Sequence, residues 1–169
     1  MAQVSVSNLS FIYEGSINTV FEGVSFCIDT DWKLGFIGRN GKGKTTFLKL
    51  MLGKYPYQGE IKTPVSFDYF PYSLSNEQVQ LCAIDWMNQI KPSCEYWRVC
   101  RDLSEMNASS ELLSQPFSHL SSGQQTKVQL AILFSSEHDF LLIDEPTIHL
   151  DQQARECVKM YLQKKKGFI

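Results

Sequence analysis

The segment from Gly38 to Thr45 contains the residues whose types and spacing point most directly to chemistry. It reads GRNGKGKT and fits the pattern G-x-x-x-x-G-K-[ST]. Glycines allow such a loop to fold around a phosphate with successive backbone N–H groups facing it, and a following helix adds partial positive charge. The pattern therefore predicts a nucleotide phosphate site; the alternative is a glycine-rich turn that arose by chance. We expect the backbone contacts to come from Gly38, Asn40, Gly41 and Gly43.

Side chains at the end of this loop are suited to the phosphates and to a metal ion. We expect Lys44 to hold the β- and γ-phosphates and the Thr45 hydroxyl to supply one ligand of Mg²⁺. Thr46 is close enough in the sequence to reach another phosphate oxygen.

An acidic pair, Asp144 and Glu145, directly follows the apolar run Phe140–Ile143. The carboxyl end of a buried strand is where the ligands of an open α/β sheet collect. We therefore expect Asp144 to hold Mg²⁺ through water and Glu145 to act as general base toward an attacking water, with Lys44 as the other catalytic residue. Taken alone, the pair is equally well explained by a helix N-cap or a solvated turn.

Hydrophobic periodicity predicts the elements that position these residues. Alternating apolar residues indicate two antiparallel strands, one over residues 4–13 and one over residues 24–28. The short apolar run Leu34–Ile37 predicts a strand that leads into the glycine-rich loop. Helical spacing over Thr45–Leu52 then predicts a helix that Gly53 ends.

Residues 75–116 are predicted to form a helical insert after a strand at Val65–Phe70. The apolar spacing in the insert changes to threes and fours, which predicts one helix from Ser75 to Pro92, a second opened by Ser93 and a short third from Ser109. The elements expected after the insert are a helix opened by Ser121 and Gln124 in a capping box, a buried strand at Phe140–Ile143 and a helix over Gln152–Lys166.

The composition is that of one soluble domain. The chain has 169 residues with 16 Lys and Arg against 18 Asp and Glu, a formal charge of −2, so no overall basic field favours DNA binding. Apolar stretches are far shorter than the about 18 residues of a membrane helix, and the first residues lack the pattern of a secretory signal. We therefore expect a cytoplasmic protein without a membrane segment. The five cysteines form no CxxC pair and the histidines add no zinc-site spacing, so we expect reduced thiols.

A further set of motifs gives the sequence a family resemblance. Leu120–Gln124 reads LSSGQ and resembles the LSGGQ signature of ABC-type ATPases, and it lies between the phosphate loop and the acidic pair, in that family's order. Asp144–Asp151 reads DEPTIHLD and resembles the DEPTNHLD sequence of the ABC-F class, soluble proteins that act on ribosomes. Residues 32–35, 67–71 and 124–128 are most similar to those of its ribosomal protection members, which confer resistance to lincosamides, streptogramin A and pleuromutilins.

The resemblance implies a fold and a set of partners. The fold is α/β, a P-loop NTPase core of the ABC ATPase type with an antiparallel β subdomain at the N-terminus, an inserted helical subdomain and its C-terminal strands missing. The implied cofactors are ATP and Mg²⁺, with Tyr13 stacking on adenine. Ser121, Gly123 and Gln124 would face the nucleotide held by a second ABC ATPase domain, and the full-length protein would act at the 50S tRNA site of the ribosome. The ordinary alternatives are a strand aromatic for Tyr13 and a helix cap for Ser121.

Several positions depart from the family pattern. Ser122 replaces a glycine of the signature, Ile148 replaces an asparagine, and Tyr72 stands where many members carry a glutamine. Gly167–Ile169 resembles the start of a strand that lies in the middle of the family's parallel sheet, which would make residues 1–169 a truncated first nucleotide-binding domain. Two other hypotheses stay open: the ATP-binding subunit of a membrane transporter, and an inactive gene remnant.

Overall fold

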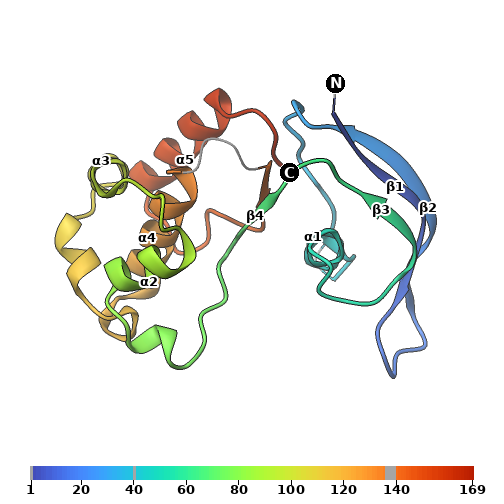
Figure 1. Cartoon of the computed structure of the whole chain (residues 1–169), viewed down its shortest axis with the longest axis horizontal. Helices are drawn as coiled ribbons and strands as arrows, with labels where there is room; N and C mark the ends of the chain where they lie inside the picture. Colours follow the sequence, from blue (N-terminus) through green and yellow to red (C-terminus); the bar gives the residue numbers. More distant parts are fainter. Residues whose placement is uncertain (1, 40, 136–139) are drawn as a thin grey trace. The chain divides into compact units, whose positions relative to one another are not determined.

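The fold is described from a computed structural model, which covers residues 2–39, 41–135 and 140–169 (Figure 1). The chain divides into two compact units. Unit 1 comprises Met1–Asp68, Asp139–Asp144 and Lys166–Ile169, and unit 2 comprises Tyr69–His138 and Glu145–Lys165. Each unit buries its own set of apolar side chains.

Unit 1 contains a three-stranded antiparallel sheet in the order β2 (Thr19–Asp29), β1 (Gln3–Ile12) and β3 (Gln58–Lys62), whose strands run side by side in Figure 1. The predicted pairing of the first two strands is confirmed. The alternating side chains of β1 that the sequence singled out, Val4, Val6, Leu9 and Phe11, are buried. Sequence reasoning missed β3, because this strand is polar apart from the half-buried Ile61 and so lacks an apolar alternation.

The helix after the phosphate loop is α1, Lys44–Met51. Its core-facing side chains, Phe47, Leu48, Leu50 and Met51, are all buried. Gly53 follows with a φ of +66°, and its N–H donates to the carbonyl of Leu50 at 2.9 Å. This left-handed residue satisfies a free carbonyl at the end of the helix, which confirms the predicted stop.

A two-stranded sheet is formed by β4 (Phe67–Phe70) and β5 (Phe140–Ile143), both close to their predicted bounds. Phe168 lies beside β5, with parallel bridges to Leu141 on one side and to Lys33 on the other. Its N–H donates to the Trp32 carbonyl at 3.2 Å. The last residues therefore occupy a strand position between the segment before the phosphate loop and the strand before Asp144, as the family resemblance implied.

The strand expected over Leu34–Ile37 is wrong for most of its length. Leu34 still donates its N–H to the Phe168 carbonyl at 3.0 Å, but the following residues are in no strand or bridge, and Ile37 is 94% exposed. A short apolar run becomes a strand only where a neighbouring segment supplies backbone partners. Here the neighbouring segment, Gly167–Ile169, reaches no further than Leu34.

Unit 2 is helical, and the described part contains α2 (Ala83–Ile90), α3 (Tyr96–Glu105), α4 (Ser122–Phe134) and α5 (Gln152–Lys164), seen together in Figure 1. A short 3₁₀ turn, η1 at Gln78–Gln80, precedes α2, and two more, η2 at Ser110–Ser114 and η3 at Phe117–His119, lie between α3 and α4. The largest fully buried side chains of this unit are Trp86, Met87, Leu103, Met106, Leu113, Phe117, Leu130, Ile132 and Leu133.

The single helix predicted from Ser75 to Pro92 is wrong over its first half, which forms only the η1 turn at Gln78–Gln80 before the backbone changes at Leu81 and Cys82 and α2 begins at Ala83. The capping box that was expected does form, with Ser75 Oγ accepting from the Gln78 N–H at 3.2 Å. The backbone then leaves the helix because Cys82 pairs with Pro116 in an antiparallel bridge and Ala83 donates to the Gln115 carbonyl at 3.0 Å. Pairing with a distant segment has replaced the local helical bonds.

The next predicted helices differ in detail. The helix expected to open at Ser93 begins at Tyr96 with Glu95 as N-cap. The short element expected from Ser109 is the η2 turn, in which the Ser109 side chain accepts from the Glu111 N–H at 3.2 Å. Both predictions located an element correctly and erred on its bounds or its type.

Candidate nucleotide-binding site

The phosphate loop closes around its own lysine. Lys44 Nζ donates to the carbonyl of Gly38 at 2.8 Å and to that of Arg39 at 3.3 Å, and the Lys42 N–H also donates to Arg39 at 3.3 Å. Asn40, predicted to take part, lies outside the described residues. The contacts of Lys44 tie the start of α1 to the first residues of the loop.

The first turn of α1 is suited to an anion. Gly43 is its N-cap with a φ of +90°, and no side chain of the described residues caps it. The first N–H groups of a helix have no partners within the helix, so here they remain available to a ligand. A Cβ at Gly43 would lie 2.8 Å from Val20 Cγ1, whereas one at Gly38 or Gly41 would meet nothing within 4 Å. Glycine is therefore required at Gly43 both by conformation and by space.

Two oxygen groups predicted to hold Mg²⁺ come together in unit 1. Thr45 Oγ1 donates to Asp144 Oδ2 at 2.6 Å, although 99 residues separate them in the sequence. Hydroxyl and carboxylate oxygens are the ligands that Mg²⁺ prefers, and this ion is bound mainly through a few such groups together with phosphate oxygens. The donor set at the end of β5 and the start of α1 therefore fits magnesium.

Tyr13 lies just after β1 within a group of aromatic rings. Its ring centroid is 4.8 Å from that of Phe11 and 5.6 Å from that of Tyr55, both in edge-to-face arrangements. Its hydroxyl is 2.7 Å from Thr46 Oγ1, and the residue stays 39% exposed. Sequence reasoning missed Tyr55, which has no motif of its own, and it missed the contact of Thr46 with Tyr13.

The signature residues of unit 2 form the start of α4. Ser121 Oγ accepts from the Gln124 N–H at 3.3 Å, and the Ser121 N–H donates to Gln124 Oε1 at 2.8 Å. The capping box predicted from the sequence is confirmed. A Cβ at Gly123 would lie 2.8 Å from the backbone oxygen of His149, so the start of α4 packs closely against residues of the DEPTIHLD segment.

An ion pair joins the same two segments. Lys127 on α4 is almost buried, with 10% of its side chain exposed, and its Nζ lies 2.5 Å from Asp151 Oδ2. The ammonium lowers the pKa of the Asp151 carboxyl, and the N–H of Ala154 lowers it further. The hydrogen bond from the Ala154 N–H to the Asp151 side chain also makes Asp151 the N-cap of α5. A hollow of about 380 Å³ lies at this junction, and its lining includes Ser121, Gly123, Lys127 and His149.

The remaining positions singled out in the sequence also lie in unit 2. Glu145 is exposed with a φ of +49°, and its carbonyl accepts from the Ile148 N–H at 3.3 Å. Tyr72 packs its ring edge-to-face on Trp86, with centroids 5.3 Å apart. Tyr72 thus stands in a packed position, whereas the side chain of Ile148 is 46% exposed.

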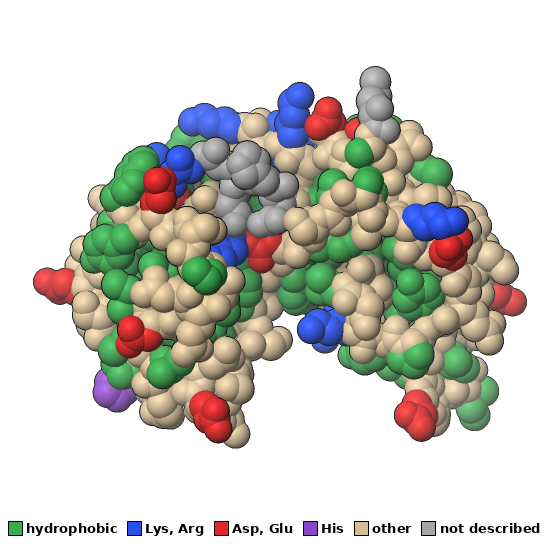
Figure 2. All heavy atoms as spheres, in the orientation of Figure 1, with side chains coloured by type: hydrophobic (Ala, Val, Ile, Leu, Met, Phe, Trp, Pro, Cys, Tyr) green, Lys and Arg blue, Asp and Glu red, His purple; other side chains and the backbone are tan. Residues whose placement is uncertain are grey.

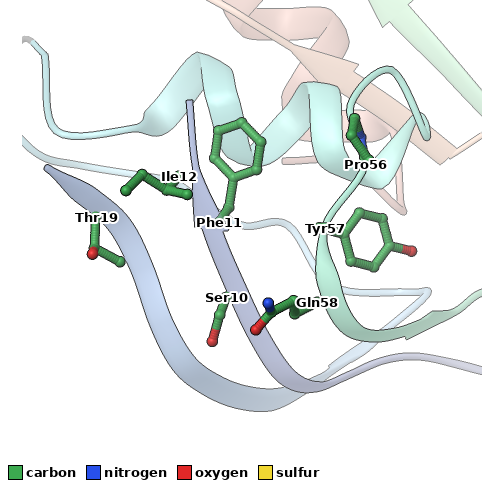
Figure 3. Close-up of a pocket in the computed structure, with 7 residues that line it drawn as sticks. All are labelled: Ser10, Phe11, Ile12, Thr19, Pro56, Tyr57 and Gln58. Atoms are coloured by element: carbon green, nitrogen blue, oxygen red, sulfur yellow. The ribbon is translucent and has the colours of Figure 1, made fainter. Parts of the chain in front are cut away.

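A second hollow, in unit 1, lies apart from the phosphate loop. Its volume is about 420 Å³, and Figure 3 shows the residues that line it, which come from β1, from the start of β2 and from the segment that leads into β3. Among the described residues, its lining includes none of the predicted site residues: it consists of Ser10, Phe11, Ile12, Thr19, Pro56, Tyr57 and Gln58.

Within the described residues, no helix has the length and apolar character needed to cross a membrane. The face seen in Figure 2 carries side chains of both charge signs in scattered positions, in keeping with a net charge of −2.

Comparison with known proteins agrees with the architecture. A glycine-rich loop at a helix start, an acidic residue after a buried strand and a helical unit with a capped signature define an α/β P-loop ATPase domain. The family model described as ABC transporter matches residues 21–148. The chain therefore belongs to the ABC transporter family of ATPase domains. Domains of this family bind ATP with Mg²⁺ and work with a second ATPase domain.

The chain is similar to relatives from bacteria and from human. An uncharacterized ABC transporter ATP-binding protein of Bacillus subtilis, YfmM, is 32% identical over 81% of this chain, and the match covers 27% of YfmM. The human ATP-binding cassette sub-family F member 3 is 26% identical over 98% of this chain, and the match covers 24% of the human protein. The molybdate import ATP-binding protein MolC of Haemophilus influenzae is 30% identical over 92% of this chain, and the match covers 64% of MolC.

A solved structure described as a metal-chelate type ABC transporter in an inward-facing conformation matches with a TM-score of 0.73 and 26% identity. The match covers 99% of this chain and 71% of that one. The chain thus spans about a quarter of YfmM and 71% of the chain of this solved structure.

Proposed function

We propose that this chain binds Mg-ATP at the loop of unit 1 and takes part in ATP hydrolysis. The observation that supports it best is the contact of Thr45 with Asp144, which brings a metal-binding hydroxyl and carboxylate together next to the lysine of the phosphate loop. Lys44 neutralises charge on the β- and γ-phosphates, and the N–H groups of Gly41 and Gly43 with the start of α1 hold their oxygens.

Magnesium, when bound, withdraws charge from the phosphate oxygens and makes the terminal phosphorus easier to attack. Thr45 and Asp144 hold the ion. Glu145 serves as general base and takes a proton from the attacking water. Ser121, Gly123 and Gln124 complete the site of a second ATPase domain, since their helix start presents positive partial charge.

The test of ATP binding is isothermal titration calorimetry of the purified chain with Mg-ATP. Lys44→Ala should abolish detectable binding, because the ammonium group loses its contact with two phosphates. Lys42→Ala, a change of the same kind in an exposed lysine of the same loop, should leave the affinity nearly unchanged. Equal loss in both variants, or no binding by the wild-type chain, would contradict the proposal.

At the level of the whole protein, we infer an ABC-F type ATPase that acts on the ribosome in the cytoplasm. The DEPTIHLD segment and the human sub-family F relative support this inference. A ribosomal protection role against lincosamides, streptogramin A and pleuromutilins follows from the motif resemblance. Co-sedimentation of a full-length protein carrying this domain with ribosomes, together with a rise in the inhibitory concentration of these drugs on expression, is the expected result.

A second candidate function is the ATP-binding subunit of a membrane transporter. The similarity to MolC and to the transporter structure favours it. Co-purification with a membrane protein, and not with ribosomes, would support this alternative. An inactive remnant is the third possibility, and a chain that binds Mg-ATP without measurable turnover under any pairing condition would support that one.

A further inference from the structure

The hydrogen bond between Tyr13 and Thr46 joins two residues that the sequence analysis assigned to opposite ends of a nucleotide, Tyr13 to the adenine and Thr46 to the phosphates. Tyr13 lies just after β1, and Thr46 lies in the first turn of α1. Their hydroxyl oxygens are 2.7 Å apart. Thr46 is buried, at 6% exposure, whereas Tyr13 is 39% exposed. An exposed ring is thus fixed by a buried group of the phosphate-binding helix.

The ring is also fixed by its aromatic neighbours. Phe11 contacts it at an interplanar angle of 80° and Tyr55 at 79°, and Phe11 itself is buried. Edge-to-face contacts of this kind favour one ring orientation. With its hydroxyl bonded to Thr46 as well, Tyr13 has little rotational freedom left before a ligand arrives.

We propose that Thr46 is a positioning residue for the nucleotide base: through its hydroxyl it fixes the Tyr13 ring on which a purine stacks. This proposal rests on the proposed function. A ring that is already ordered binds more tightly, because the entropy of ordering it is not lost on association. A hydroxyl has one donor and two acceptor positions, so direct contact of Thr46 with a phosphate is the competing role to be tested.

The test separates the base from the phosphates by using two ligands, Mg-ATP and magnesium tripolyphosphate, with the 169-residue chain. Tyr13→Phe keeps the ring and removes its hydroxyl. We expect its Kd for Mg-ATP to rise about threefold to tenfold, the effect of one net hydrogen bond, with the Kd for tripolyphosphate unchanged. Thr46→Val should give the same pattern. Thr46→Ser, which keeps a hydroxyl, should bind both ligands with wild-type affinity.

The double variant Tyr13→Phe with Thr46→Val should bind Mg-ATP no more weakly than either single variant, because both changes remove the same hydrogen bond. Tyr57→Phe, in the same unit but at the hollow of Figure 3, is the matched control and should bind like wild type. Thermal melts establish that each variant is folded.

Two results would overturn the proposal. One is an unchanged Mg-ATP affinity in folded Tyr13→Phe. The other is a Thr46→Val variant that loses affinity for tripolyphosphate as much as for Mg-ATP, since this would assign Thr46 to the phosphates. Failure of the proposed function is distinguishable, because the wild-type chain would then bind neither ligand, which overturns both proposals.

Discussion

The first turns of α1 and α4 are two helix starts that the proposed function uses for phosphate, and they are built differently. At α4, Ser121 and Gln124 satisfy each other's backbone N–H groups in a reciprocal capping box. At α1, Gly43 stands in the N-cap position with a left-handed backbone and no capping side chain among the described residues. The start of α4 satisfies two of its N–H groups with its own side chains, whereas no side chain of the described residues caps the start of α1.

This difference indicates which property each region controls. A cap such as that of Ser121 contributes about 1 kcal/mol to stability whether or not a ligand is bound. An uncapped start with Lys44 beside it gains most when an anion arrives. We therefore expect changes at α1 to act mainly on nucleotide binding and changes at α4 mainly on the free energy of unfolding.

The largest effect is expected for Gly43→Ala. Its Cβ would meet Val20 and Phe21 in a backbone conformation that alanine rarely adopts, so we expect a destabilisation of about 3 kcal/mol and loss of Mg-ATP binding. Urea unfolding and calorimetry measure the two effects. Gly15→Ala, with a φ of +76° in open space, should cost only about 1 kcal/mol and leave binding intact. Equal costs at the two glycines would refute the steric argument.

A smaller effect on binding alone is expected for Thr45→Val. Loss of its hydroxyl should weaken Mg-ATP binding about tenfold, in the range found for groups that support a metal site. Removing the metal with EDTA should make variant and wild type bind ATP equally weakly. Thr63→Val, which removes an exposed hydroxyl elsewhere in unit 1, should change neither measurement. A tenfold difference that persists in EDTA would show that Thr45 acts on the nucleotide and not on the metal.

The ion pair between Lys127 and Asp151 should make the stability of the chain depend on pH in the acid range. Lys127 keeps the pKa of Asp151 lower in the folded than in the unfolded chain, so the pair stabilises above about pH 4 and its contribution is lost as the pH falls through the folded pKa. Melting temperatures measured from about pH 6 down to pH 3 should therefore fall less steeply for Asp151→Asn than for wild type. The asparagine still offers an oxygen to the Ala154 N–H, so α5 keeps its cap. Parallel curves would contradict this assignment.

The smallest effect should come from Ser121→Ala, which removes one half of the capping box. We expect a loss of about 1 kcal/mol in the free energy of unfolding and an unchanged affinity for Mg-ATP in this chain alone. Ser122→Ala, one residue further on, should have a smaller effect on stability because its side chain is not the N-cap. A strong loss of nucleotide binding in Ser121→Ala would show that the two helix starts are not independent.

Much of the site could be predicted because its parts are local in the sequence. The glycine pattern with the helix after it, and Ser121 with Gln124 three residues on, depend on short-range geometry that a sequence displays directly. The apolar run Phe140–Ile143 placed Asp144 at the end of a strand, and the structure puts it there, next to Thr45.

The parts that the sequence did not predict depend on distant partners. Among the described residues, none pairs with the expected strand at Leu34–Ile37 beyond Leu34, and the expected helix from Ser75 was interrupted by pairing of Cys82 with Pro116. The contact of Thr46 with Tyr13 spans 33 residues. Periodicity describes one segment at a time, so it contains no information on which segment will supply the missing hydrogen bonds.

The three-residue segment around Phe168 has a consequence for the integrity of unit 1. Its backbone forms hydrogen bonds with residues 32–34 on one side and with Leu141 and Ile143 on the other. Both neighbouring segments therefore depend on the peptide groups of these three residues for their pairing. We expect a carboxypeptidase that trims Gly167–Ile169 to raise deuterium uptake at Leu34 and Leu141 together. Such trimming would let the Thr45 and Asp144 oxygens drift apart without any change in the residues that bear them.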